Sequence, residues 1–144
     1  MTGSALRKAA IENLVRQYDL IAVYGFGSRA QEVVAWLEGA PLVIPPSSDV
    51  DIGVLPAPGR HLTAREKVTL ALALEDLFGV GRVDLVVLPE APPFLALDIV
   101  CGELLYTSDP DAEAEYQLYV LRRAGDLAPY ERQRRRMILA GEMP

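Results

Sequence analysis

Two aspartates separated by a single residue are the side chains of this sequence best suited to chemistry. Asp49 and Asp51 lie in residues 49–55, an otherwise apolar run that predicts a β-strand. Side chains alternate between the two faces of a strand, so both carboxylates are expected on one face, with Cβ atoms about 6 to 7 Å apart. Ionised carboxylates this close repel each other, and a bound cation relieves the repulsion. Mg²⁺ suits this position, because it takes oxygen ligands from one or two carboxylates together with substrate phosphates.

A glycine and a third carboxylate extend this candidate site. Gly53 continues the same strand face and is expected either to leave open space beside the metal or to be a plain flexible strand glycine. Asp84 stands in the apolar run 82–88, which predicts another buried strand, and a charge there needs a partner. If the two strands are neighbours, Asp84 completes a three-carboxylate cluster able to hold two metal ions for an in-line phosphoryl displacement.

The turn at residues 25–28, Gly-Phe-Gly-Ser, separates a predicted strand from a predicted helix. Backbone N–H groups, a hydroxyl and a helix N-terminus converge at such a turn, which predicts an anion site. The turn lacks the third glycine of a dinucleotide-binding turn and the Gly-Lys-Ser/Thr of a P-loop. Taken without the rest of the sequence, a tight strand-to-helix connection is the more frequent explanation.

The remaining sequence supplies the elements that must position these groups. Apolar residues at helical spacing, helix caps and β-branched runs divide the chain into alternating helices and strands. Helices are predicted over residues 4–18, 29–37, 63–78, 93–101, 110–123 and 129–139, and strands over residues 20–24, 49–55, 82–88 and 104–106. Because no linker or internal repeat interrupts them, residues 1–144 are expected to form one α/β domain, with a mixed β-sheet, packed helices and a carboxylate cleft at the sheet edge.

Composition and charge exclude several classes of function. The 144 residues carry a formal net charge of −6, which makes nucleic acid an unlikely partner, because such binding neutralises phosphates with Lys and Arg. No apolar stretch is long enough to cross a bilayer and the polar N-terminus is no signal peptide, so a cytoplasmic protein without membrane contact is expected. The only histidine, His61, has polar neighbours and is expected to be solvated rather than a catalytic base.

Three further features favour structural interpretations. The only cysteine, Cys101, cannot form an internal disulfide and is expected to be a buried, inert thiol. Tyr116 and Tyr119 are expected in the core. The arginine cluster of residues 132–136 is expected to be a solvated helical face, with an acidic partner or RNA as the alternative.

The order of the chemical motifs resembles a known family. A Gly-Ser turn at residues 27–28, the run Ser-Asp-Val-Asp at residues 48–51 and Asp84 on a later strand are similar to the signature of the nucleotidyltransferase superfamily built on the DNA polymerase beta fold. The sequence around these motifs resembles that of the small prokaryotic MNT branch. The resemblance covers most of the chain, from about residue 20. Residues 102–106 and the arginine-rich end resemble antitoxins that pair with HEPN toxins.

The resemblance implies a role for each residue of the site. Nucleotide-binding residues are expected at Gly27, Ser28, Arg29 and Ser48, and catalytic, metal-binding residues at Asp49, Asp51 and Asp84. Asp84 would either complete the metal site or activate the attacking hydroxyl. Mg²⁺ is the expected cofactor, and ATP or another nucleoside triphosphate is the expected substrate.

The activity that the resemblance implies is transfer of AMP from ATP to a hydroxyl, which in a toxin–antitoxin pair would be a tyrosine of a HEPN-type toxin. Two alternatives stay open: a non-catalytic antitoxin that acts by binding, and a transferase that acts on a small molecule such as an aminoglycoside. A homo-oligomer is also compatible with the sequence. Residues 31–47 make the segment between the Gly-Ser turn and the Asp pair longer than is usual in the family, so this loop is expected to shape, cover or obstruct the nucleotide pocket.

Overall fold

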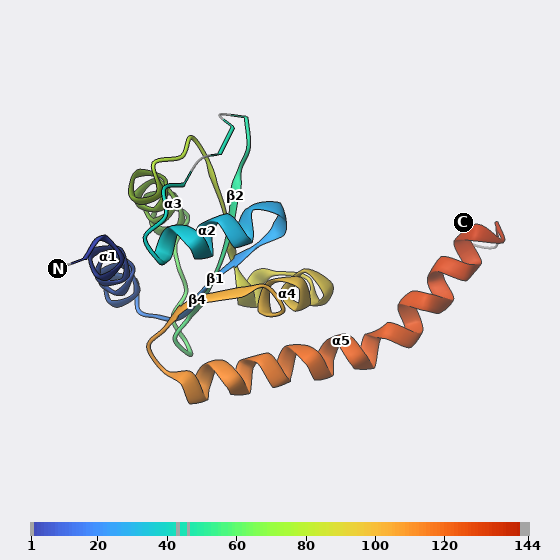
Figure 1. Cartoon of the computed structure of the whole chain (residues 1–144). Coiled ribbons are helices and arrows are strands. Elements are labelled where there is room, and N and C mark those ends of the chain that lie inside the picture. The colour runs from blue at the N-terminus through green and yellow to red at the C-terminus, as the bar shows by residue number, and fades with distance from the viewer. Residues whose placement is uncertain (1, 43, 46, 142–144) are drawn as a thin grey trace.

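A mixed β-sheet forms the centre of the molecule. The computed structural model describes residues 2–42, 44–45 and 47–141, and Figure 1 shows the chain from its N-terminus in blue to its C-terminus in red. Four strands are hydrogen-bonded in the order β3-β2-β1-β4. Their bounds are β1 (Leu20–Phe26), β2 (Val50–Pro56), β3 (Val83–Val87) and β4 (Glu103–Thr107). The predicted α/β fold with a mixed sheet is confirmed, and the strand expected over residues 104–106 is the edge strand β4.

The directions of the strands decide which strand ends lie next to one another. β1 runs antiparallel to both of its neighbours, β2 and β4, whereas β2 and β3 are parallel. The parallel pair is connected through the helix α3 (Ala64–Phe78), as such a crossover requires. The end of β1 and the beginnings of β2 and β3 therefore lie at the same edge of the sheet.

Helices cover both faces of the sheet (Figure 1). α1 (Gly3–Gln17), α2 (Ala30–Leu37) and α3 contribute side chains to a first core cluster, and α4 (Pro93–Val100) and α5 (Pro110–Leu139) contribute to a second. Alternation along β2 feeds both clusters, since Val50, Ile52 and Val54 belong to the first and Leu55 to the second. Asp51 and Gly53, on the face opposite to Val50 and its partners, thus point to the side of α4 and α5.

Local signals explain where α3 begins and ends. The side chain of Thr63 accepts from the backbone N–H of Glu66, and the carboxylate of Glu66 accepts from the backbone N–H of Thr63, which is the predicted capping box. Gly79 ends the helix with a φ of 71°, a left-handed conformation that favours glycine. Phe78, at the end of α3, packs edge-on against Trp36 of α2.

The C-terminal part of the chain differs from the prediction. Two helices were expected, over residues 110–123 and 129–139, but α5 is a single helix of 30 residues with Pro129 inside it. A proline removes one backbone hydrogen bond and pushes against the carbonyl four residues earlier, which bends a helix without always ending it. In Figure 1 the C-terminal part of α5 turns and extends away from the sheet. Ala124 is the last buried residue of this helix.

The exposure of four side chains can be compared with the prediction. Cys101 is exposed, so the predicted buried thiol is wrong; the residue follows the last turn of α4, where the chain reverses towards β4. The expected core position of Tyr119 is also wrong, because its side chain is 52% exposed, while Tyr116 is half-buried. His61 is exposed, as predicted. Among the described residues, no helix has the length and apolar character needed to cross a membrane.

Candidate active site

The Gly27-Ser28 turn lies where β1 ends. A single 3-10 turn, η1 (Gly27–Arg29), joins β1 to α2. Gly27 has a φ of 73°, which side chains of L-residues rarely allow, and a Cβ atom at this position would collide with Oδ2 of Asp51. Glycine is therefore required here both by backbone conformation and by the close approach of the β2 carboxylate.

The helix start beyond this turn is open to an anion. Neither Phe26 before η1 nor Arg29 before α2 provides a side-chain cap to the helix N-terminus. Ser28 is exposed, and its hydroxyl has no hydrogen-bond partner among the described residues, so it does not act as a helix cap in this chain. Backbone N–H groups at an uncapped helix start, together with a nearby hydroxyl, form a suitable site for a phosphate.

The structure brings all three predicted carboxylates to this edge. Asp51 of β2 is the register partner of Phe26 on β1 and of Asp84 on β3. Asp49 lies one residue before β2 begins, so the expectation that it belongs to the strand is off by one residue. The Gly27 turn and the carboxylates of Asp49, Asp51 and Asp84 are thus neighbours through sheet register, although they are far apart in sequence.

Electrostatics single out Asp51 within the cluster. Burial, and then the negative charges of Asp84 and Asp49, raise the pKa of the Asp51 carboxyl above its ordinary value. Within the described chain, Asp51 has neither a hydrogen bond nor an ion pair. A half-buried carboxylate with two acidic neighbours and no cation of its own is the group that a bound metal ion would stabilise most.

Arg82 is a member of the site that the sequence did not reveal. Its Nη2 lies 3.1 Å from Oδ1 of Asp84, and its Nε lies 3.8 Å from Oδ2 of Asp49. One available signal was its position two residues before Asp84, which places both side chains on the same strand face. The contact with Asp49 depends on the pairing of β2 with β3, which the sequence pattern does not give.

Two predicted nucleotide-binding residues contact each other. Nη2 of Arg29 donates to Oγ of Ser48 at 3.1 Å, and Nη1 of Arg29 donates to Oε1 of Glu32 at 3.0 Å. Arg29 thereby ties the start of α2 to the residue before Asp49. The guanidinium stands beside the carboxylate edge, and Glu32 and Ser48 hold it in place.

A family model decides which proteins this site is related to. Residues 9–111 match the model described as "Polymerase beta, Nucleotidyltransferase". The chain belongs to this nucleotidyltransferase family. The match contains the Gly-Ser turn and all three carboxylates, and it confirms the family that the sequence resembles. No curated protein sequence matches significantly.

Solved structures of similar fold agree with the family. A toxin–antitoxin with AMP-PNP has a TM-score of 0.70 and 22% identity, and covers 92% of this chain and 98% of that chain. The toxin–antitoxin MntA-HepT has a TM-score of 0.67 and 21% identity, with 94% and 98% covered. A complex of tri-AMPylated Shewanella oneidensis HEPN toxin with MNT antitoxin has a TM-score of 0.65 and 23% identity, with 94% and 98% covered. These likenesses show that the nucleotidyltransferase has the same fold as a chain of each complex.

The long segment before Asp49 lies beside the site of this nucleotidyltransferase. Its first part is helix α2, and Val43 and Pro46 fall outside the described residues. Leu42, Ile44 and Pro45 line a cavity of about 220 Å³ together with Ser48 and the turn at residues 79–81. The described part of the loop therefore lies close to the connection between α3 and β3.

Gly53 does not leave room for a ligand. A Cβ atom at Gly53 would collide with Cγ2 of Ile99, which is itself fully buried on α4. The predicted open space beside the metal is thus wrong, and the glycine instead allows α4 to pack closely against β2.

The residues present fit a metal that is shared with a substrate. No group of three or more His, Cys, Asp or Glu in the described chain already has the arrangement of a complete metal site. Mg²⁺ does not need one, since it is commonly held by one or two carboxylates plus phosphate oxygens and water. Asp51, which has two acidic neighbours and no cation, satisfies this requirement together with Asp49, and Asp84 stands beside them.

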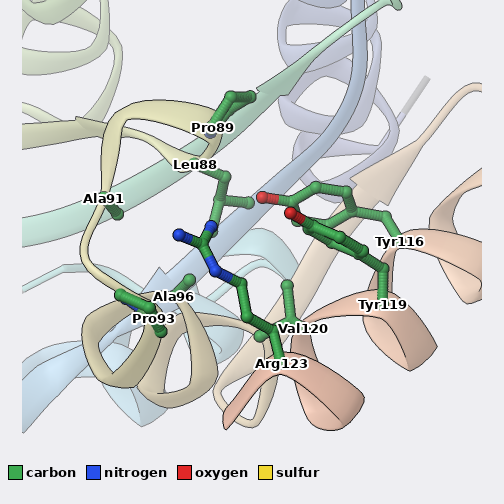
Figure 2. Close-up of a pocket in the computed structure, with 9 residues that line it drawn as sticks. All are labelled: Leu88, Pro89, Ala91, Pro93, Ala96, Tyr116, Tyr119, Val120 and Arg123. Atoms are coloured by element: carbon green, nitrogen blue, oxygen red, sulfur yellow. The ribbon is translucent and has the colours of Figure 1, made fainter. Parts of the chain in front are cut away.

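Two other cavities contain none of the predicted site residues. Figure 2 shows one of about 100 Å³ where Arg123 of α5 reaches towards Leu88, beside the rings of Tyr116 and Tyr119. The other, of about 460 Å³, lies at the far end of β2 and is lined by Pro56 and His61 among other residues. Both are lined by apolar side chains together with polar ones, and neither reaches the edge where the Gly27 turn and the three carboxylates lie.

Proposed function

We propose that this chain transfers AMP from ATP to a tyrosine hydroxyl of a HEPN-type toxin partner, with the help of a divalent metal ion. The observation that carries the proposal is the meeting of the uncapped Gly27-Ser28 turn with Asp49, Asp51 and Asp84 at one sheet edge. An anion site next to a carboxylate cluster is the combination that nucleotidyl transfer requires.

Each residue has a defined task in the transfer. The backbone of Gly27 and the hydroxyl of Ser28 bind the triphosphate and orient its α-phosphorus. Asp49, Asp51 and Asp84 would hold Mg²⁺, which when bound neutralises phosphate charge in the transition state. The hydroxyl oxygen of the acceptor attacks the α-phosphorus, the bond to pyrophosphate breaks, and Asp84 accepts the hydroxyl proton. His61 lines a cavity at the other end of β2 and takes no part.

The similar complexes support the choice of donor and acceptor. One of them contains AMP-PNP, an ATP analogue, and another contains an AMPylated HEPN toxin bound to an MNT antitoxin. This chain has the same fold, and its family signature lies at the same edge as its open helix start. Adenylate transfer to a protein partner is therefore favoured over transfer to a small molecule.

The exposed side chains of α5 favour one second candidate, an antitoxin that acts by binding alone. Beyond Ala124 this helix exposes large apolar side chains, including Tyr130 at 71% and Leu139 at 87% exposure. The same segment carries the arginine cluster of residues 132–136, whose side chains are exposed. Such a surface can hold a partner without any transfer chemistry.

Intact-mass spectrometry of the co-purified HEPN-type partner separates the two candidates. After incubation with Mg²⁺ and ATP, the partner should gain one or more adenylate groups, and the double variant Asp49→Asn, Asp51→Asn should add none. Asp76→Asn, an exposed carboxylate of α3, is the matched control and should act like the parent. If the partner stays unmodified but is still silenced by the double variant, neutralisation is by binding alone.

A further inference from the structure

Arg82 lies between two of the three site carboxylates. Its guanidinium contacts Asp84 at 3.1 Å and Asp49 at 3.8 Å, whereas Asp51 has no cationic partner within the described chain. A cation at this point partly neutralises the cluster before any metal ion arrives. The three acids of the cluster are therefore not equally available to a metal.

The pairing of the backbones of β2 and β3 places Arg82 beside Asp49 and Asp84. The N–H of Val50 donates to the carbonyl oxygen of Arg82 at 3.1 Å, which continues the parallel pairing of β2 with β3. Val50 and Val83 are register partners, so the residues before them, Asp49 and Arg82, are level across the two strands. The N–H of Val83 also donates to Oε1 of Glu75 on α3 at 3.1 Å, which fixes the start of β3.

A metal ion that approaches Asp49 and Asp84 meets this guanidinium first. Arginine keeps its charge at any pH at which a protein is folded, so Arg82 cannot yield by losing a proton. It must move, and its side chain is 68% exposed, which leaves room for it to turn outwards. Once released, a guanidinium is well suited to bind phosphate oxygens with two parallel hydrogen bonds.

We propose that Arg82 is a built-in counter-ion that competes with the divalent metal for Asp49 and Asp84, and that a bound triphosphate accepts the released guanidinium. Metal and nucleotide then bind cooperatively: each improves the affinity of the other by the same factor, because binding energies are linked. The inference rests on the proposed nucleotide and metal site. It adds a positioning residue that makes metal loading depend on the presence of nucleotide.

Mn²⁺ binding measured by electron paramagnetic resonance, with and without AMP-PNP, tests the proposal on the full chain. Without nucleotide, Arg82→Gln should bind Mn²⁺ about five- to tenfold more tightly than the parent, since two partly exposed ion pairs no longer compete. AMP-PNP should strengthen Mn²⁺ binding strongly in the parent and less in Arg82→Gln. Arg82→Lys keeps the charge and should retain most of the competition.

Arg65→Gln is the matched control, because it removes one exposed positive charge from the first turn of α3, near the opposite end of β2. If Arg82→Gln binds Mn²⁺ no more tightly than Arg65→Gln, while the parent still binds Mn²⁺ with AMP-PNP, the role of Arg82 is refuted and the site stands. If the parent binds no Mn²⁺ in either condition, the proposed metal site fails and the role of Arg82 fails with it. Far-ultraviolet circular dichroism confirms that each variant is folded.

Discussion

The phenol of Tyr24, on the central strand β1, donates a hydrogen bond to the buried carboxylate of Glu113 on α5. Nε2 of Gln117 donates to the same carboxylate oxygen at 3.0 Å. Tyr24 has no solvent exposure, and burial, followed by the hydrogen bond to Glu113, raises the pKa of its phenol well above the ordinary value. These three side chains fasten the first half of α5 to the sheet.

Removing the Tyr24 hydroxyl is expected to destabilise the fold. In Tyr24→Phe the buried carboxylate of Glu113 loses a donor, which should lower the free energy of unfolding by about 1 to 3 kcal/mol. Tyr106→Phe is the control, because Tyr106 is partly buried and its hydroxyl has no hydrogen bond within the described chain. Urea denaturation measures both. Equal losses in the two variants would show that the contact with Glu113 is of no energetic importance.

The same contact predicts a loss of stability at alkaline pH. The unfolded chain releases the Tyr24 proton near the ordinary tyrosine pKa of about 10, whereas the folded chain keeps it to higher pH. The contribution of Tyr24 to the free energy of unfolding is therefore complete below about pH 10 and is lost as the pH rises above it. The free energy of unfolding should fall less steeply above pH 10 in Tyr24→Phe than in the parent. Parallel curves would contradict the prediction.

Asp51→Asn should stabilise the chain when no metal is present. The pKa of Asp51 is raised in the folded chain. Its contribution to the free energy of unfolding is therefore fully present at acid pH and is lost as this carboxyl ionises with rising pH. At neutral pH in chelator the variant should melt above the parent, and the difference should disappear in acid. Saturating Mg²⁺ and ATP, at about one hundred times the dissociation constant, should add about 2.7 kcal/mol to the free energy of unfolding of the parent but not of Asp51→Asn. Asp76→Asn should follow the parent throughout.

Ser28→Ala should weaken triphosphate binding without disturbing the fold. The hydroxyl is exposed and caps no helix, so its loss removes one hydrogen bond to a charged ligand, worth about 1.5 to 3 kcal/mol. Ser47→Ala, an exposed serine of the neighbouring loop, is the control. Calorimetry with ATP and Mg²⁺ gives the affinity. A variant that melts much earlier but binds ATP normally would instead make Ser28 a structural residue.

Pro129→Ala should strengthen the C-terminal half of α5 alone. A proline inside a helix costs about 3 kcal/mol relative to alanine, and the residues after Ala124 are mostly exposed. Amide exchange over residues 125–141 should slow, while the global free energy of unfolding changes little. Gly125→Ala should act in the same direction by about 0.8 to 1 kcal/mol, because nothing lies within 4 Å of an added Cβ atom. A large global effect would mean that this segment packs on the body.

The carboxylate edge was predictable because its signals are local or follow from strand geometry. The apolar alternation around Asp51, the isolated acid Asp84 and the Gly27 turn each mark one element, and the order of the three indicated the family. The capping box at Thr63 and Glu66 is similarly local, and the structure contains both of its hydrogen bonds.

Features that depend on how elements meet were missed. Arg82 contacts Asp49 only because β2 and β3 pair in parallel, and no pattern within either strand specifies this register. Gly53 faces Ile99 because α4 packs over β2, and Ile99 therefore fills the open space that was expected at Gly53. The sequence predicts a helix boundary at Pro129, but whether a proline ends or bends a helix depends on the helix that surrounds it.

The place of β1 between β2 and β4 has a consequence for the order of folding. Ala22 pairs with Thr107, so the central strand stays open on one side until the last third of the chain has been synthesised. Every residue of the candidate site is made before β4 and before Glu113, the partner of the buried Tyr24. Pairings this distant in sequence slow folding, and an open strand edge invites association with other chains in the meantime. The rate-limiting event is thus expected to be the docking of the latest part of the chain onto one of its earliest strands.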